Sequence, residues 1–174
     1  MNPQFLSAHA NTPIVRRLVK NLIEVGCDQI IVVVGHHRQQ VRGAVADLPG
    51  VEFVTQSPLD GTATATLEAS KKLTNDRYLI VYGDIVTGVE NFRCLIEAFD
   101  KSGAAAAAMV QPLGHEEAGN WICAGISDEL LTGIEGHPRG GSHRLCGIYA
   151  FKTSATSYLL RNPGLVTRVP VGGM

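Results

Sequence analysis

Two hydrophobic periods alternate along this chain, and their alternation restricts the fold more than any other feature of the sequence. Apolar residues recur at helical spacing between Pro13 and Gly26, and an apolar, largely β-branched run over residues 29–34 follows directly. Such a run is typical of a strand covered on both faces. Helices and strands that alternate in this way indicate a parallel α/β sheet with right-handed crossovers.

The same alternation continues along the chain. Further helices are predicted over 38–47, 63–73, 91–101 and 154–161, and further strands over 51–55, 78–82, 104–110, 121–126, 130–134 and 146–152. Residues 104–110 are rich in alanine, but their short length between Gly103 and Pro112 favours a buried strand. The fold class is therefore α/β, a Rossmann-like, mostly parallel sheet with helices on both faces. Residues 113–143 are expected to form a loop-rich face over the ligand pocket.

Length and charge exclude several classes of protein. A chain of 174 residues suits one domain with a proper core, so residues 1–174 are interpreted as a single domain. With 15 Lys and Arg against 16 Asp and Glu, the chain lacks the basic surface that nucleic acid requires. Neither a leader-like segment nor an apolar run of about 18 residues is present. These features predict a cytoplasmic protein with no nucleic-acid or membrane partner.

The four cysteines indicate neither a zinc site nor a disulfide framework. They are scattered without C-x-x-C spacing, which favours reduced thiols in the core; they are Cys27, Cys94, Cys123 and Cys146. His36 and His37 are interpreted as loop histidines at a pocket rim, because adjacent side chains diverge and no carboxylate partner is evident.

Two loops that follow predicted strands form a candidate ligand site. Residues 56–63 read Q-S-P-L-D-G-T-A, and Tyr82-Gly83-Asp84 ends the strand predicted over 78–82. An amide and a glycine turn can read a flat base, and an acid at a strand's carboxyl end can hold Mg²⁺ against phosphates. Taken singly, these residues are also explained as a strand end, a turn, a helix cap and a solvated aspartate. Their combination favours a nucleotide site.

The ordered motifs resemble those of the sugar-1-phosphate nucleotidylyltransferases, especially the N-acetylglucosamine-1-phosphate uridylyltransferase domain. The matching stretches are I-V-V-V-G-H at 31–36, V-T-Q at 54–56 with G-T-A at 61–63, L-I-V-Y-G-D at 79–84, T-G-I at 132–134 and G-I-Y at 147–149. The resemblance implies a sheet of the nucleotide-diphospho-sugar transferase type that is incomplete at both ends.

The resemblance also implies roles for particular residues. By this resemblance, Asp84 binds the catalytic Mg²⁺. The nucleotide is bound by Gln56, Gly61, Thr62, Tyr82 and Gly83. The implied reaction transfers a nucleotidyl group from UTP to N-acetylglucosamine-1-phosphate and releases pyrophosphate. The implied ligands are a nucleoside triphosphate or a nucleotide sugar.

Several positions depart from the family pattern. The glycine-rich L-A-A-G-x-G-T-R-M-like loop is missing, Gln4 stands where the catalytic lysine is expected, and Leu145 replaces an asparagine on the sugar side. Glu135 is a candidate for the sugar-binding glutamate, and a second metal carboxylate would come after Met174. No catalytic residue is therefore intact, and the isolated chain is expected to have little or no activity.

Three interpretations stay open at this level. The chain is a truncated enzyme, a degenerate relative that still binds nucleotide, or a non-catalytic Rossmann-like binding or regulatory subunit of an oligomer. In the family the missing first strand lies inside the sheet, so its neighbours lack backbone partners. The chain is then expected to pair with another copy of itself, to draw its N-terminal residues into the gap, or to be poorly stable.

Overall fold

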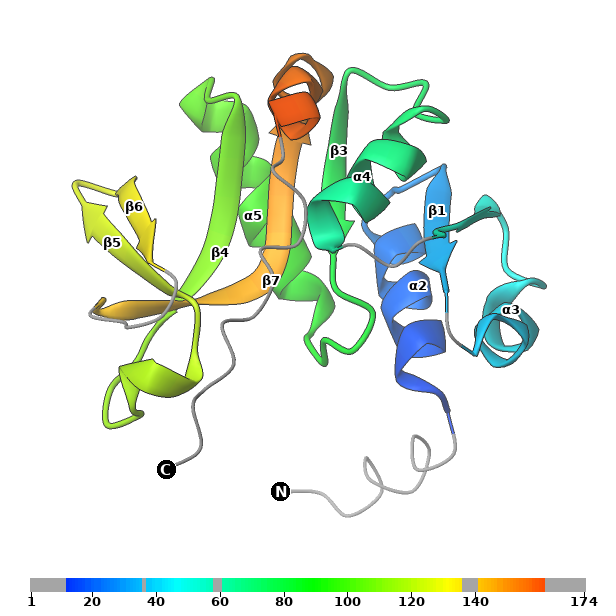
Figure 1. Cartoon of the computed structure of the whole chain (residues 1–174), viewed down its shortest axis with the longest axis horizontal. Coiled ribbons are helices and arrows are strands. Elements are labelled where there is room, and N and C mark those ends of the chain that lie inside the picture. The colour runs from blue at the N-terminus through cyan, green and yellow to red at the C-terminus, as the bar shows by residue number, and fades with distance from the viewer. Residues whose placement is uncertain (1–11, 36, 58–60, 136–140, 162–174) are drawn as a thin grey trace, which may run out of the picture.

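The computed structural model describes residues 12–35, 37–57, 61–135 and 141–161. Within these residues the strands form two sheets, and no strand of one sheet is hydrogen-bonded to a strand of the other. β1 (Ile30–Val34) and β2 (Val51–Thr55) pair in parallel, with Ile30 opposite Val51. A second, five-stranded sheet contains β3 to β7. Figure 1 shows the two sheets, with β1 and β3 as neighbours.

β7 (His143–Lys152) organises the larger sheet. It pairs antiparallel with β3 (Arg77–Val81) and with β4 (Ala106–Pro112), so β3 and β4 run in the same direction. The start of β7 also pairs with β5 (Cys123–Ser127), which forms a hairpin with β6 (Leu130–Glu135). The parallel pairing expected from the sequence is present between β1 and β2, whereas the pairs around β7 are antiparallel because β7 runs against all its partners.

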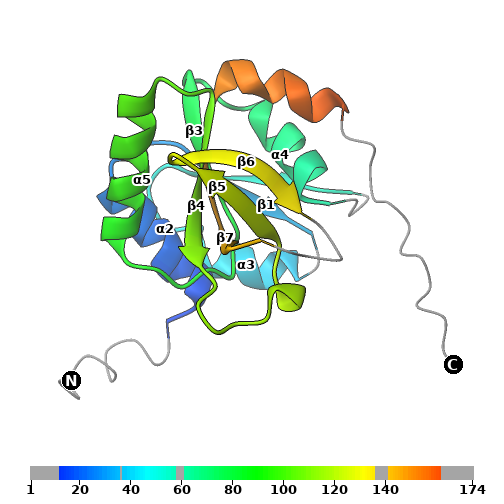
Figure 2. The ribbon, with the colours of Figure 1, turned by 90° about the vertical axis from the view of Figure 1, so that its left-hand side faces the viewer.

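Helices cover both faces of the strands, as the sequence predicts. α2 (Ile14–Glu24), α3 (Arg38–Val45) and α5 (Val89–Ser102) lie on one face. α4 (Thr62–Ser70) and the 3₁₀ helix η2 (Thr153–Arg161) lie on the other, as Figure 2 shows. A short 3₁₀ turn, η1 (Ala118–Asn120), precedes β5. Within the described residues, each helix is too short or too polar to cross a membrane.

The hydrophobic core lies on the α2, α3 and α5 face. The apolar stripe of α2 buries Leu18, Val19 and Leu22, as its helical spacing predicts. Phe92 of α5 and Val45 of α3 have no exposed surface. Together with Ile30, Leu95, Phe99, Ile148 and Ala150 these side chains form one cluster. The core thus joins the two sheets through helices rather than through strand pairing.

β1 is less buried than its sequence predicts. Ile30 and Val34 are buried, but the three residues between them are only half-buried. The four residues Tyr78 to Val81 of β3 are half-buried as well. The expectation of a strand covered on both faces is met only in part for β1, because Ile31 to Val33 stay half-buried. The physical reason is that no described strand pairs with its second edge.

A salt bridge between α2 and the segment after α3 gives a pH-dependent contribution to stability. Arg16 donates to both carboxylate oxygens of Asp47, at 2.6 and 2.8 Å. The hydrogen bond from Arg16 lowers the pKa of Asp47 to about 2. Because this value lies below the usual ~3.9, the contribution is present above about pH 4 and is lost as the pH falls towards 2.

The variant Asp47→Asn is therefore expected to lose less stability than the unchanged chain between about pH 4 and pH 2. Urea unfolding midpoints measured at several pH values in this window check the difference. Glu97→Gln, which neutralises an exposed carboxylate in a 3.7 Å pair with Lys101, is the matched control. Equal pH dependence in Asp47→Asn and the unchanged chain would contradict the assignment.

Candidate functional site

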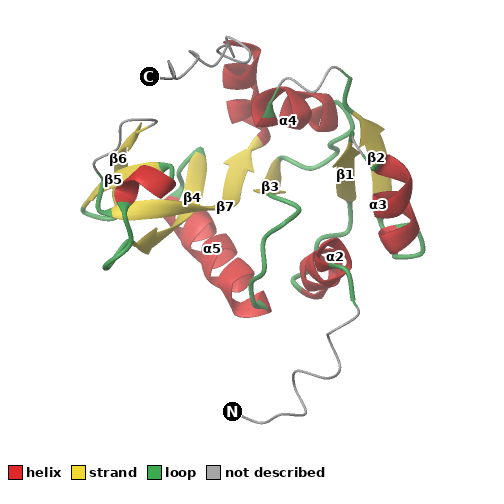
Figure 3. Ribbon diagram, turned by 60° about the horizontal axis from the view of Figure 1, so that its bottom comes forward, coloured by secondary structure: helices red, strands yellow, loops and turns green. Residues whose placement is uncertain are grey.

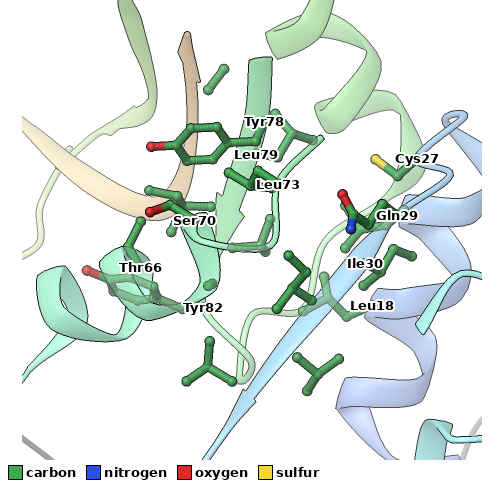
Figure 4. A pocket seen from close by; sticks show the side chains of 18 of the residues that line it. Leu18, Cys27, Gln29, Ile30, Thr66, Ser70, Leu73, Tyr78, Leu79 and Tyr82 are labelled. Atoms are coloured by element: carbon green, nitrogen blue, oxygen red, sulfur yellow. The ribbon is translucent and has the colours of Figure 1, made fainter. Parts of the chain in front are cut away.

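A cavity of about 960 Å³ lies between β1 and β3, and we call it the β1–β3 cavity. Figure 4 shows its walls: Ile30 and Leu79 come from the strands, Leu18 from α2, and Thr66 and Ser70 from α4. The walls are mainly apolar along the strands. They are polar at both ends of the strands. At the carboxyl ends, which we call the polar end, they carry six of the residues singled out in the sequence: Gln56, Gly61, Thr62, Tyr82, Gly83 and Asp84.

The turn between β2 and α4 forms one side of the polar end. Gln56 extends the β1–β2 ladder, because its backbone N–H donates to Val34 O at 3.0 Å. Its side-chain Nε2 donates to Gly61 O, also at 3.0 Å. Gly61 has φ 110° and ψ 173° at the N-cap of α4, a conformation that favours glycine. The amide of Gln56 and the glycine turn are therefore held together as one unit.

The turn after β3 forms the other side. Tyr82 N–H donates to Gly147 O at 3.0 Å, and Ile85 N–H donates to Tyr82 O at 3.3 Å. These bonds fix the turn against β7 and leave Asp84 exposed at the rim of the cavity. Within the described ranges, no group of three or more His, Cys, Asp or Glu side chains could hold a metal. A single carboxylate fits Mg²⁺ that is shared with phosphates, rather than an all-protein metal cage.

Tyr149 packs against Tyr82 in this turn. It lies in the G-I-Y stretch, but the sequence motifs gave it no role of its own. Its ring centroid lies 5.9 Å from that of Tyr82, with the rings tilted by 56°. Burial, followed by the hydrogen bond with Tyr82, raises the pKa of Tyr149. Tyr149 therefore stays a neutral phenol at physiological pH and positions Tyr82.

Gly147→Ala is expected to destabilise the chain by about 2 kcal/mol and to disturb the Tyr82 turn. Gly147 has φ 72°, and a Cβ at this position would lie 2.9 Å from Tyr82 Cδ2. Urea denaturation measures the loss. Gly133→Ala in β6 is the matched control, because a Cβ there would meet no atom within 4 Å. Equal stabilities of the two variants would show that Gly147 does not hold the turn.

The other predicted residues lie away from the β1–β3 cavity or outside the described residues. Gln4 and His36 lie outside them, and His37 is exposed at the N-cap of α3 with φ 55°. Glu135 ends β6 opposite Cys123, and its side chain is not described. Leu145 lies within β7, where its N–H donates to Ile122 O at 3.0 Å.

The expectation that residues 113–143 lie over the pocket is wrong for the described part of this segment. None of its described residues lines the β1–β3 cavity. They form η1 and the β5–β6 hairpin, at the end of the molecule opposite β1 and β2 in Figure 1. The reason is that β5 pairs with the start of β7, whereas β3 pairs with its second half.

The fold and this site define an α/β domain that has a polar candidate ligand site at the carboxyl ends of its strands. Residues 3–150 match the model of the MobA-like NTP transferase domain family. The chain belongs to this family of nucleotidyltransferases.

Curated relatives of this chain include proteins named bifunctional protein GlmU. That of Bordetella parapertussis is 33% identical over 88 residues, which cover 48% of this chain and 19% of the relative. That of a Synechococcus species is 25% identical over 166 residues, which cover 91% of this chain and 37% of the relative. The chain thus spans about a fifth to somewhat over a third of these proteins.

A solved structure of UDP-glucose pyrophosphorylase in complex with UDP-glucose shares the fold. The two structures superpose with a TM-score of 0.73 at 14% identity. The matched region covers 88% of this chain and 69% of the pyrophosphorylase chain. At this identity the likeness concerns the fold alone. It agrees with the sheet type expected from the motifs.

Proposed function

We propose that this chain binds a uridine nucleotide at the polar end of the β1–β3 cavity, with Mg²⁺ shared between Asp84 and the phosphates. The observation that carries the proposal is the placement of six residues, from two separate turns, around one cavity. The resemblance of those turns to uridylyltransferase motifs supports uridine as the base.

The two sides of the cavity suit the two ends of a nucleotide. The bond from Gln56 to Gly61 O fixes an amide beside a glycine turn, where a planar base can pack and form hydrogen bonds. The exposed carboxylate of Asp84 is an oxygen ligand of the kind that Mg²⁺ uses together with substrate phosphates. When bound, the ion would offset the negative charge of the phosphates.

The reaction proposed for the family domain transfers uridylate from UTP to N-acetylglucosamine-1-phosphate. An oxygen of the sugar phosphate attacks the α-phosphorus, and the bond to the β-phosphate breaks to release pyrophosphate. We propose that the isolated chain has little or no turnover, because Gln4 cannot supply the charge of the expected lysine. Loss of one such contact costs on the order of 10² in rate. The proposed location is the cytoplasm, in keeping with four cysteines that are all free.

Calorimetric titration with UTP, dTTP, GTP, UDP-glucose and UDP-N-acetylglucosamine, each with Mg²⁺ and with EDTA, tests the proposal. We expect uridine nucleotides to bind best, Mg²⁺ to strengthen UTP binding, and Gln56→Ala to weaken it. The absence of binding by every nucleotide would refute the proposal. A pyrophosphate assay with UTP and N-acetylglucosamine-1-phosphate tests the expected inactivity, which rapid release would contradict.

A further inference from the structure

The β5–β6 hairpin and the residues just before it carry most of the exposed large apolar side chains in the described part of the chain. Leu130 is 68% exposed, Ile134 60% and Leu131 41%. Trp121 and Ile122, which precede β5, are exposed as well. Figure 3 shows the hairpin at the end of the molecule remote from β1 and β2. Large apolar side chains gathered on a surface in this way are typical of a site that binds a partner.

Leu131 and Ile134 lie on the same face of the hairpin. In the β5–β6 ladder Ile134 lies opposite Ala124, and Leu131 lies opposite Ile126. Residues directly opposite each other share a face, and so do Ala124 and Ile126, which are two positions apart on β5. The register of the ladder shifts between Gly125 and Ile126. This shift brings Leu131 and Ile134 to one side although they are three positions apart.

β6 is an edge strand whose outer side can accept a further strand. It pairs with β5 on its inner side, and among the strands of the described residues none pairs with its outer side. In Figure 2 the hairpin faces the viewer, with β6 in yellow. An unpaired edge presents a row of backbone N–H and C=O groups to another chain, and Lys or Pro on the edge discourages such pairing. β6 reads L-L-T-G-I-E and contains neither residue.

The charge around β6 indicates which kind of strand this edge can accept. Residues 113–135 contain no Lys or Arg. Their acidic residues are Glu116, Glu117, Asp128, Glu129 and Glu135. Glu116 pairs with Arg144 of β7 at 2.9 Å, whereas Glu117, Asp128 and Glu129 are exposed and form no ion pair with another described residue. A basic strand is therefore attracted to this edge, while a second copy of β6 brings a second set of acidic residues and is repelled.

Arg144 holds the loop before β5 in place, so the surface is formed before a partner binds. Its guanidinium carbon lies 4.1 Å from the centre of the Trp121 ring. Its Nη2 donates to Gln111 Oε1 at 2.7 Å, and its Nη1 donates to Glu116 Oε2 at 2.9 Å. Because these side chains are already fixed, a partner that docks beside them loses little binding free energy to their ordering.

We propose that the outer edge of β6 binds an extended peptide segment of a partner protein, with apolar side chains at alternate positions and Lys or Arg at both ends. The segment adds to the sheet as a strand, and its apolar side chains pack beside Leu131 and Ile134. Its basic ends lie at the two ends of β6, where Glu129 precedes the strand and Glu135 is its last residue. This inference goes beyond the proposed nucleotide binding and does not depend on it.

Titration of the chain with synthetic peptides tests this proposal. The probe is K-K-V-T-V-T-V-K-K with blocked ends, and the comparison peptides are E-E-V-T-V-T-V-E-E and the lysine peptide N-methylated throughout its V-T-V-T-V centre. We expect the lysine peptide to bind at least about tenfold more tightly than either, because one lacks the opposite charge and the other lacks N–H donors. No binding of the lysine peptide up to about 1 mM, or equal binding of either comparison peptide, would overturn the proposal.

The position of the bound peptide is read from backbone amide shifts of the chain. With the lysine peptide we expect the largest changes in β6. Changes centred on β1 and β3 would place the peptide in the β1–β3 cavity and would overturn the proposal.

Two matched substitutions then test the edge itself. Ile134→Lys places a like charge beside the basic peptide and is expected to weaken its binding by about tenfold or more. Val86→Lys adds the same charge at a position that is 63% exposed and lies away from the hairpin, so it should leave binding nearly unchanged. Both positions are exposed, so both variants are expected to fold. Equal effects of the two substitutions, or no effect of Ile134→Lys, would overturn the proposal.

Sedimentation of the chain without peptide tests the other possible occupant of the edge, a second copy. We expect Ile134→Lys to leave the sedimentation coefficient unchanged. A dimer that this substitution separates would assign the β6 edge to a second copy and would overturn the proposal.

Discussion

Asp84→Asn is expected to weaken Mg²⁺-dependent UTP binding by about 10²-fold. The carboxylate is exposed at the rim of the β1–β3 cavity, so the change leaves the packing untouched. It removes the negative charge that we propose pairs with the cation, and loss of one partner of a close charge pair costs about 2–5 kcal/mol. Calorimetry with Mg²⁺ and with EDTA measures the effect. In EDTA the variant and the unchanged chain should bind UTP almost equally.

Asp128→Asn provides the matched control for Asp84. Asp128 is also exposed, but it lies in the β5–β6 turn, away from the cavity. Its neutralisation removes the same charge from the chain as a whole and should leave UTP binding unchanged. If both variants weakened binding equally, the effect would reflect net charge, and Asp84 would not be the metal ligand.

Phe92→Ala is expected to lower the free energy of unfolding by about 3–5 kcal/mol. Phe92 has no exposed surface and belongs to the cluster that joins α2, α5 and β7. The loss is large against the 5–15 kcal/mol that is typical of a folded domain. Removal of the Phe92 side chain should therefore lower the urea unfolding midpoint strongly and leave the variant marginally folded.

Val86→Ala serves as the control for Phe92 in the same urea experiment. Val86 is 63% exposed, and substitutions at such positions change stability by about 0.5 kcal/mol or less. A loss below about 1 kcal/mol for Phe92→Ala would contradict the central position of the α2–α5 cluster in the core.

Local patterns were enough to predict the elements. The predicted strand over 51–55 matches β2, and the stripe on α2 buries the residues that its spacing indicates. The alanine-rich run forms β4 (Ala106–Pro112) despite its helical propensity. Such features depend on residues close in sequence, where period, glycine and proline carry the information.

Long-range features were not predictable from the same patterns. A strand sequence does not show which edges find partners, so the half-burial of Ile31 to Val33 and the position of the β5–β6 hairpin were missed. The candidate site shows the same division. Gln56 and Asp84 could be placed at strand ends, but the bond from Gln56 to Gly61 and the contact of Tyr149 with Tyr82 depend on the folded chain.

Mapping of backbone amide shifts during titration with Mg²⁺ and UTP tests the central claim most directly, because it reports where the nucleotide binds. We predict that the largest changes occur in the two turns at the polar end of the β1–β3 cavity, at Gln56, Gly61, Thr62, Gly83 and Asp84. Changes centred on the β5–β6 hairpin, or no changes at saturating UTP, would contradict the account.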